Sequence, residues 1–220
     1  MSITIPSSVT SIGNYAFQGC HSLASITIPS GVTSIGTDAF DYCYSLTSII
    51  IPSNMTSIGS SAFFGCYSLA SITIPSNVTS IGSSAFYQCY ALTNIAIPSG
   101  VTSIEFSIFS YCYSLTSITI PSGVTSIGNK AFQGCHSIAS ITIPSSVISI
   151  GNSVFDSCYS MLEYHFEPTT PPTLGTTAFN NIQSNCIIYV PYSEDHSILT
   201  AYQSETNWSD YASYMQEEPQ

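Results

Sequence analysis

Basic side chains are almost missing from this sequence of 220 residues, which contains one lysine, no arginine and twelve acidic residues. Phosphate backbones and anionic membranes attract clusters of Lys and Arg, so this scarcity argues against nucleic-acid binding and electrostatic membrane binding. Residues 1–162 hold four acidic residues and Lys130, a net charge of −3, whereas residues 163–220 hold eight acidic residues and no basic one. We expect a nearly neutral body with an acidic C-terminal end.

Long hydrophobic runs are missing as well. No segment approaches the roughly 18 consecutive apolar residues that a membrane-spanning helix needs, so no membrane insertion is expected. Met1 leads directly into a predicted strand, without the basic and apolar segments of a secretory signal. Two explanations are open: the protein is not secreted by that route, or the sequence is a fragment of something longer.

A repeat of 23 residues, LxSIxIPSxVTSIGxxAFxxCxS, occurs seven times between residues 1 and 162. A fixed period of this size indicates a stack of similar units in which each unit contacts its neighbours. The repeated prolines are Pro6, Pro29, Pro52, Pro75, Pro98, Pro121 and Pro144, and the repeated cysteines are Cys20, Cys43, Cys66, Cys89, Cys112, Cys135 and Cys158. The predicted fold class is an α/β repeat solenoid that forms one elongated domain.

Each repeat predicts three short pieces of structure. The IxI segment alternates apolar and polar residues and ends at a proline, which favours a short strand; VTSIG favours a second extended segment. AFxxC is compatible with a single helical turn. Stacking would give a parallel sheet of about nine strands, about 4.8 Å apart, and a continuous aromatic spine. The strands expected from the repeats are Ile3–Ile5, Ile26–Ile28, Ile49–Ile51, Ile72–Ile74, Ile95–Ile97, Ile118–Ile120 and Ile141–Ile143, and the spine is Phe17, Phe40, Phe63, Phe86, Phe109, Phe132 and Phe155.

The C-terminal quarter departs from the repeat. Residues 163–191 are predicted to form a degenerate eighth repeat and a ninth strand at Ile187–Val190, again followed by proline. Residues 192–220 are predicted to form a helical cap, with one helix that Ser193 caps and that runs through roughly Gln203, and a second one over Trp208–Met215. A solenoid needs its last apolar face covered, and the acidic residues of the cap would prevent further stacking.

The N-terminal end shows the opposite pattern. Ile3, Ile5, Ile12 and Phe17 begin the repeat with no polar element before them, which leaves an uncovered apolar end. Either the array is a truncation of a longer one, or this end associates with another subunit.

Eight cysteines would ordinarily suggest the disulfides of a secreted protein. Seven of them occupy one column of the repeat, where stacked side chains point in parallel and give poor disulfide geometry. We therefore predict a column of buried free thiols, with the redox state of Cys186 left open. A glycine column contains Gly13, Gly36, Gly59 and Gly82, and its fifth position is Glu105. Because a glutamate disfavours left-handed backbone, we predict that this column has negative φ or a mild bulge.

The repeat LTSIxIPSxVTSIGxxAFxxCxSL, as in Leu115–Ser137, resembles the leucine-rich repeats of the BspA-like, or Treponema-type, family. The closing segments PPTLGTTAF, CIIYVP and NWSDYASYMQ resemble the C-terminal end of such proteins from gut and oral bacteria. The resemblance covers nearly the whole chain. It implies a curved right-handed solenoid with the IxI strands on the concave side, and a surface-exposed or secreted protein used for adhesion to proteins of a host or a neighbouring cell. It supplies no catalytic residues.

The repeat does not bring together polar residues that could act in catalysis. His21 and His136 share a column, but five steps of about 4.8 Å separate them, so they cannot share a metal or a substrate. Asp195 and His196 lie near serines, but no nucleophile motif accompanies them and they are interpreted as a helix start. We predict no enzymatic activity, no catalytic residue, no cofactor and no metal site.

Binding surfaces are better candidates, because stacking turns each column of the repeat into a stripe. The outward positions of the IxI strands are rich in hydroxyls, which either bind a partner or are merely solvated. The residue after each cysteine is Tyr or His, and tyrosine either contributes binding area or only stabilises the stack. The candidate partner-binding residues are Tyr44, Tyr67, Tyr90, Tyr113, Tyr159, Ser25, Thr27, Ser71, Thr73, Ser117 and Thr119.

Two variable columns are predicted to be left free by the fold, so that they could carry specificity. They are Tyr15, Asp38, Ser61, Ser84, Ser107 and Lys130, and Gln18, Asp41, Phe64, Tyr87, Ser110 and Gln133.

The leading hypothesis is a non-catalytic protein-binding or adhesion module of a microbial cell-surface or secreted protein, whose partner is a host-matrix protein or another cell surface. The alternative is a structural spacer or self-stacking fibre element that associates through the N-terminal end. Ice binding by the regular Ser-x-Thr arrays is a third hypothesis, and the curvature implied by the family argues against it.

Overall fold

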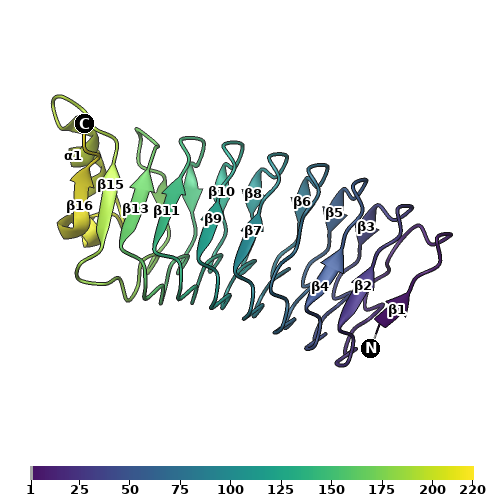
Figure 1. The fold of residues 1–220 in the computed structure, drawn as a ribbon. Helices are drawn as coiled ribbons and strands as arrows, with labels where there is room; N and C mark the ends of the chain where they lie inside the picture. Colours follow the sequence, from purple (N-terminus) through teal and green to yellow (C-terminus); the bar gives the residue numbers. More distant parts are fainter. Residues whose placement is uncertain (1) are drawn as a thin grey trace.

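Each 23-residue repeat folds into one coil, and the coils stack along one axis in chain order (Figure 1). The computed structural model describes residues 2–220. Coil one begins at Ser2, coil two at Ser25, and each later coil at the start of the next repeat. Within a coil, a first strand leads through the Pro-Ser loop to a two-residue second strand, and a series of turns returns the chain to the next first strand. Parallel pairing at a constant offset, with Ile26 beside Ile3, confirms the predicted solenoid.

The first strands form one face of the stack and the second strands form another. The first strands are β1 (Ser2–Thr4), β2 (Ser25–Thr27), β4 (Ser48–Ile50), β7 (Asn94–Ala96), β9 (Ser117–Thr119), β11 (Ser140–Ile143), β13 (Glu163–Phe166) and β15 (Ile187–Val190). The second strands are β3 (Ser34–Ile35), β5 (Ser57–Ile58), β6 (Ser80–Ile81), β8 (Ser103–Ile104), β10 (Ser126–Ile127), β12 (Ser149–Ile150) and β14 (Thr173–Leu174). Most first strands begin one residue before the predicted start, and the expected strand Ile72–Ile74 is reduced to a bridge between Ser71 and Asn94.

The core runs along the axis between the two faces. In the first strands the middle isoleucine is buried and its two neighbours are exposed, as the alternating sequence predicts. The predicted aromatic spine is confirmed, since the stacked phenylalanine rings follow one another at 5.1 to 5.7 Å from Phe17 to Phe155 and on to Phe179. Each ring from Phe40 to Phe155 is therefore covered on both sides by a phenylalanine of a neighbouring coil.

The predicted helical turn at AFxxC is wrong, because this segment is a chain of turns with left-handed residues, such as Tyr15 at φ 60°. In a helix the backbone N–H groups would bond within the segment. Here every second N–H donates to the next coil instead: Tyr15 donates to Thr37 at 2.9 Å and Phe17 donates to Ala39 at 2.8 Å. Each left-handed non-glycine residue costs about 1–2 kcal/mol, and the hydrogen bonds between coils offset this cost.

The glycine column has no left-handed residue, which confirms the predicted negative φ at Gly13, Gly36, Gly59 and Gly82. Glycine is needed there for space. A Cβ on Gly59 would lie 2.6 Å from the carbonyl carbon of Gly36, closer than atoms can approach without a shift. The coils touch backbone to backbone at this column.

Glu105 interrupts that contact. Elsewhere the column N–H donates to the preceding coil, as from Gly82 to Ile58 at 2.9 Å and from Gly128 to Ile104 at 2.7 Å. Across residues 2–220 no corresponding bond joins Glu105 to coil four, and β6 does not pair with β8. The Glu105 side chain instead accepts a hydrogen bond from the Ser103 hydroxyl at 2.5 Å. The glutamate therefore coincides with a break in the second sheet.

The cysteine column is confirmed as free thiols, and seven of the eight cysteines are buried. In six coils the Sγ–H donates to a phenylalanine carbonyl of the preceding coil, at 3.2 Å in each case. The carbonyl of Phe40, for example, accepts both from the Cys43 N–H of its own coil and from the Cys66 thiol of the next. Cysteine thus fills a small buried space and adds a weak hydrogen bond between coils.

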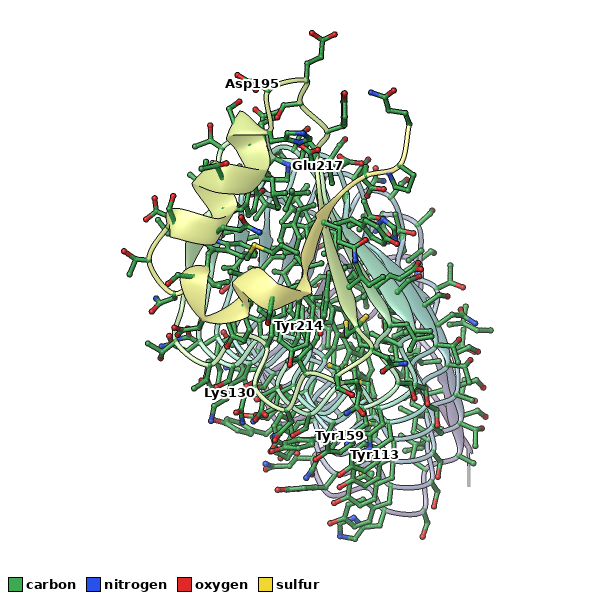
Figure 2. The ribbon with its side chains drawn as sticks, turned by 90° about the vertical axis from the view of Figure 1, so that its left-hand side faces the viewer. Tyr113, Lys130, Tyr159, Asp195, Tyr214 and Glu217 are labelled. Atoms are coloured by element: carbon green, nitrogen blue, oxygen red, sulfur yellow. The ribbon has the colours of Figure 1, made fainter. Side chains whose placement is uncertain are left out.

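The C-terminal end is covered by α1 (Ser197–Ser204), the 3-10 helix η1 (Ser209–Tyr214) and β16 (Met215–Glu217) (Figures 1 and 2). Helix α1 begins at Ser197 and its N-cap is His196, three residues after the predicted cap Ser193, although the Ser193 hydroxyl still accepts the Ile198 N–H. Trp208 is fully buried and its indole N–H donates to the Pro172 carbonyl at 2.7 Å. Sequence analysis missed β16, which pairs in parallel with β15.

The N-terminal end is less covered. Ile3, Ile5 and Phe17 are only partly buried, whereas their equivalents in the next coil are buried. This difference agrees with the uncovered end that the sequence predicts, except at Ile12, which is buried.

Replacing Gly59 by alanine should lower the free energy of unfolding by about 2 kcal/mol, because the new Cβ overpacks the contact between coils. Gly13→Ala is a matched control in the same column, since a Cβ there meets nothing within 4 Å. Urea unfolding of both variants measures the difference. Equal losses in the two variants would contradict the space argument.

Alkylation with iodoacetamide at mildly alkaline pH should label native Cys20, which is partly exposed, and spare the seven buried cysteines. Burial raises the pKa of the Cys43 thiol to about 12 and that of Cys66 well above its ordinary value, and only the thiolate reacts. Mass spectrometry should find eight labels after unfolding. Rapid labelling of Cys89 in the native protein would contradict this prediction, because it would show that the reagent reaches the buried cysteine column.

Candidate binding surfaces

The outward side chains of the first strands form what we call the hydroxyl face. Its members in coils two to seven are Ser25, Thr27, Ser48, Ile50, Ser71, Thr73, Asn94, Ala96, Ser117, Thr119, Ser140 and Thr142. All twelve are exposed, so the structure places six predicted binding residues, from Ser25 to Thr119, on one continuous surface. The face has no charged residue until coil eight, where Glu163 and His165 continue it.

The serine and threonine hydroxyls of this face make no hydrogen bond to any other group in the described part of the chain. Two other threonine columns behave differently. Thr47, just before a first strand, donates to the Ala24 carbonyl at 3.1 Å, and Thr56, just before a second strand, donates to the Thr33 carbonyl at 3.1 Å, each one coil back. These threonines therefore tie the coils together, while the hydroxyls on the face keep their hydrogen-bonding capacity for other molecules.

A shallow hollow lies on this face between coils six and seven. Its polar lining includes Ser117, Thr119, Ser140, Thr142 and Glu167. It lies where β9 and β11 do not pair with each other. The hollow gives the face a local concavity without adding a cluster of charges.

The residues after the cysteines form the tyrosine ladder, which runs along one edge of the stack, where Figure 2 shows Tyr113 and Tyr159. Its members are His21, Tyr44, Tyr67, Tyr90, Tyr113, His136 and Tyr159. The rings from His21 to His136 stack at 4.5 to 4.8 Å, and His136 and Tyr159 follow at 5.0 Å with a tilt of 32°. Because the ring faces cover one another, the ladder offers solvent mainly ring edges and hydroxyls. Desolvation by burial, with repulsion from neighbouring tyrosines, raises the pKa of Tyr67 and Tyr90, so these hydroxyls stay protonated.

The two variable columns are not free, contrary to the sequence-based expectation. The first, from Tyr15 to Lys130, adopts left-handed backbone with φ between 51° and 60°. In the second, Asp41 is 7% exposed and Ser110 is fully buried. The structure therefore constrains the backbone of the first column and buries part of the second. The residue types found in both columns also reflect these constraints.

Asp41 lies in an unfavourable environment. One carboxylate oxygen accepts a hydrogen bond from the Gln18 amide at 2.9 Å, and the other has no partner. Burial, opposed by the Gln18 hydrogen bond, raises the pKa of Asp41. Asp156 occupies the same column after Gln133, but it also accepts from the side-chain amide of Asn180 at 3.0 Å. In coil three that position is Phe64, which cannot donate a hydrogen bond.

Two histidines pair with glutamates of the C-terminal tail, which sequence analysis did not detect. Consecutive strand residues point to opposite sides, so Glu217 and Glu218 reach different partners. His165 Nδ1 lies 2.7 Å from Glu218 and its Nε2 lies 3.3 Å from Glu163. His196 Nδ1 lies 2.7 Å from Glu217. Each of these two tail glutamates is thus paired with a histidine, Glu218 with His165 and Glu217 with His196.

The remaining polar residues do not converge. His21 and His136 stand five coils apart in the ladder, and the Asp195 carboxylate accepts the Ser197 N–H at the start of α1, as the helix-start interpretation expects. Within residues 2–220, no group of three or more His, Cys, Asp or Glu is arranged to hold a metal ion. The helices of this part of the chain are too short or too polar to cross a bilayer.

The stacked coils, the parallel first sheet and the capped end define a leucine-rich-repeat solenoid. A family model described as BspA type leucine-rich repeat region matches six copies over residues 1–115 and 102–202. The chain therefore belongs to the BspA-type leucine-rich-repeat family.

Two solved structures are similar over most of the chain. A leucine-rich cell surface protein from Faecalibacterium prausnitzii is 36% identical with a TM-score of 0.71, and the match covers 78% of this chain and 48% of that one. A leucine-rich repeat protein of T. pallidum is 25% identical with a TM-score of 0.60, over 94% of this chain and 85% of that one. This chain thus spans about half the length of the first protein. A comparison with proteins of curated function gives no match.

His165→Gln should destabilise the protein more at about pH 5.5 than at about pH 8.5. Burial alone would lower the pKa of His165, but hydrogen bonds with Glu218 and Glu163 outweigh it and raise the pKa. The stabilisation is thus fully present below the ordinary pKa of about 6.5 and is lost as the pH rises through the raised value. We expect a loss below about 1 kcal/mol, because the pair is partly exposed.

Urea unfolding of the wild type and the variant at both pH values measures this difference. His136→Gln, which lies in the ladder away from the tail, is the control. A larger effect of His165→Gln at the higher pH would contradict the pairing.

Proposed function

We propose that this chain is a non-catalytic binding module of a microbial cell-surface or secreted protein, and that the hydroxyl face contacts a protein partner. The observation that carries the proposal is the row of exposed hydroxyls without partners on an ordered sheet. Because this sheet is already rigid, it loses little conformational entropy when a partner binds to it.

The chemistry of the face favours an uncharged stretch of a partner. A neutral surface gives no electrostatic steering, so affinity has to come from shape and from direct hydrogen bonds. Ile50 is 63% exposed among the hydroxyls and adds an apolar contact. The candidate residues Ser71, Thr73, Ser117 and Thr119 lie at the middle of the face, where contacts are desolvated most completely.

Family membership supports the proposal that binding takes place at a cell surface. The similar protein from Faecalibacterium prausnitzii is described as a cell surface protein. A host-matrix protein or a protein of another cell surface is the partner class that we propose. The tyrosine ladder borders this surface, and we propose that Tyr44, Tyr67, Tyr90, Tyr113 and Tyr159 provide hydroxyl contacts at its margin.

A second candidate function is self-association through the N-terminal end. The partial exposure of Ile3, Ile5 and Phe17 favours it, because the equivalent side chains of later coils are buried, apart from the partly buried Ile51. Sedimentation at several concentrations tests it. A mass that stays monomeric at high concentration would rule it out.

To test the hydroxyl face, Thr73→Arg and Thr119→Arg should each weaken binding to a protein partner by about tenfold or more, because each places a bulky charge at the centre of the contact. Immobilised purified extracellular-matrix proteins and bacterial surface preparations are the probes. Ser99→Arg, in an exposed Pro-Ser loop, is the matched control and should leave binding unchanged.

Two results would contradict the proposal. One is the absence of binding to every matrix and surface preparation. The other is a partner whose binding is indifferent to Thr73→Arg and Thr119→Arg but sensitive to changes elsewhere.

A further inference from the structure

A second row of aromatic side chains runs beside the tyrosine ladder in coils two to five. Phe64 and Tyr87 stack face to face in this row at 4.6 Å. At one end Tyr42 contacts Phe64, and at the other end Tyr111 contacts Tyr87, both edge to face at 84°. The same two tyrosines also touch the ladder, Tyr42 at Tyr44 and Tyr111 at Tyr113.

The contacts close into a circuit of eight rings, which we call the aromatic plate. Its members are Tyr42, Phe64, Tyr87, Tyr111, Tyr113, Tyr90, Tyr67 and Tyr44. It lies on the turns that return the chain to the first strands, and so it is separate from the hydroxyl face.

Tyr42 and Tyr111 differ from the other rings in the direction of their faces. The other six rings stack along the solenoid axis, whereas these two stand about perpendicular to their row neighbours. Each also lies over a glycine of the next coil. A Cβ on Gly65 would be 2.7 Å from Tyr42 Cδ1, and a Cβ on Gly134 would be 2.6 Å from Tyr111 Cδ1. The glycine thus lies against the Cδ1–Cε1 side of each ring, and neither ring is stacked face to face on another ring of the described residues. Tyr42 is 37% exposed and Tyr111 is partly exposed, so both rings are accessible to a ligand.

The plate is polar at its margins but carries no charge. Its seven tyrosine hydroxyls make no hydrogen bond to other groups in the described part of the chain. Coils two to five contain three charged residues, Asp38, Asp41 and Glu105, and Asp41 is buried. A charged ligand would therefore find no ion pair on this surface, while an uncharged ligand rich in hydroxyls would find both donors and acceptors.

We propose that the aromatic plate binds a neutral glycan chain along the solenoid axis, with one sugar ring on Tyr42 and another on Tyr111. The C–H groups on the apolar side of a pyranose ring carry partial positive charge, which suits the negative face of an aromatic ring. The sugar hydroxyls at the ring edge are then placed to bond the phenol groups. Three coil steps of about 4.8 Å separate the two tyrosines, so a short oligosaccharide reaches both.

This site goes beyond the proposed protein contact. It shares Tyr44, Tyr67, Tyr90 and Tyr113 with the margin proposed for that contact, but it includes no residue of the hydroxyl face, and Tyr42 and Tyr111 belong to the plate alone. A glycan on the plate leaves the hydroxyl face open, and the arginine substitutions at Thr73 and Thr119 should not alter glycan binding.

Isothermal titration with hexasaccharides of β-1,4-linked glucose and of β-1,4-linked N-acetylglucosamine tests the proposal. We expect at least one of them to bind the wild type. Tyr42→Ala and Tyr111→Ala should each reduce the affinity by about fivefold, the effect of losing one aromatic contact. Tyr42→Phe should keep most of the affinity, because it keeps the ring face.

Two variants separate this role from folding. Gly65→Ala keeps Tyr42 but displaces its ring, so it should weaken binding as Tyr42→Ala does. Tyr192→Ala removes an exposed tyrosine that lies outside the plate and should leave binding unchanged, while circular dichroism monitors the fold. The proposal is overturned if neither hexasaccharide binds at millimolar concentration, if Tyr42→Ala and Tyr111→Ala leave binding intact, or if the plate binds a protein and no hexasaccharide.

Discussion

The close approach of consecutive coils at the glycine column is the constraint on which the rest of the structure depends. At Gly36, Gly59 and Gly82 a single extra carbon would lie 2.4 to 2.7 Å from the backbone of the preceding coil. This contact sets the distance between coils. That distance in turn lets the phenylalanine rings stack, lets each cysteine thiol reach the carbonyl one coil back, and gives the hydroxyl face its regular rows. Where Glu105 interrupts the contact, the Cys112 thiol still donates to the Phe86 carbonyl at 3.2 Å and Phe86 and Phe109 still stack at 5.7 Å, so the contacts on either side keep the spacing there.

Much of this architecture could be predicted from the sequence, because equivalent positions of successive repeats lie next to one another along the axis of the stack. The aromatic spine, the free thiols and the strand Ile187–Val190 were predicted correctly from residue type and position alone. The turn segment was not, because the AFxxC spacing suits both a helical turn and a series of turns. The bonds between coils decide between them, and those bonds are not visible within one repeat.

The binding surfaces could be predicted only in part. The exposed positions of the hydroxyl face follow from strand alternation, and Ser25 to Thr119 lie where alternation places them. The sequence does not reveal that Thr47 and Thr56 are used for internal hydrogen bonds while Thr73 is not. It also does not distinguish Tyr42, which stands perpendicular to its row neighbour, from Tyr67, which is stacked on a ring on both sides. Tyr42 lies against Gly65 of the following coil, where a side chain would collide with its ring.

Glu105 provides the most direct test of the central claim, because it removes the glycine contact at one place in an otherwise uniform stack. Hydrogen–deuterium exchange resolved to single amides compares this place with the others in the same molecule. The account predicts protected amides at Gly59, Gly82 and Gly128 and fast exchange at Glu105, where no hydrogen bond to coil four is present among the described residues. Protection at Glu105 equal to that of its glycine counterparts would contradict it.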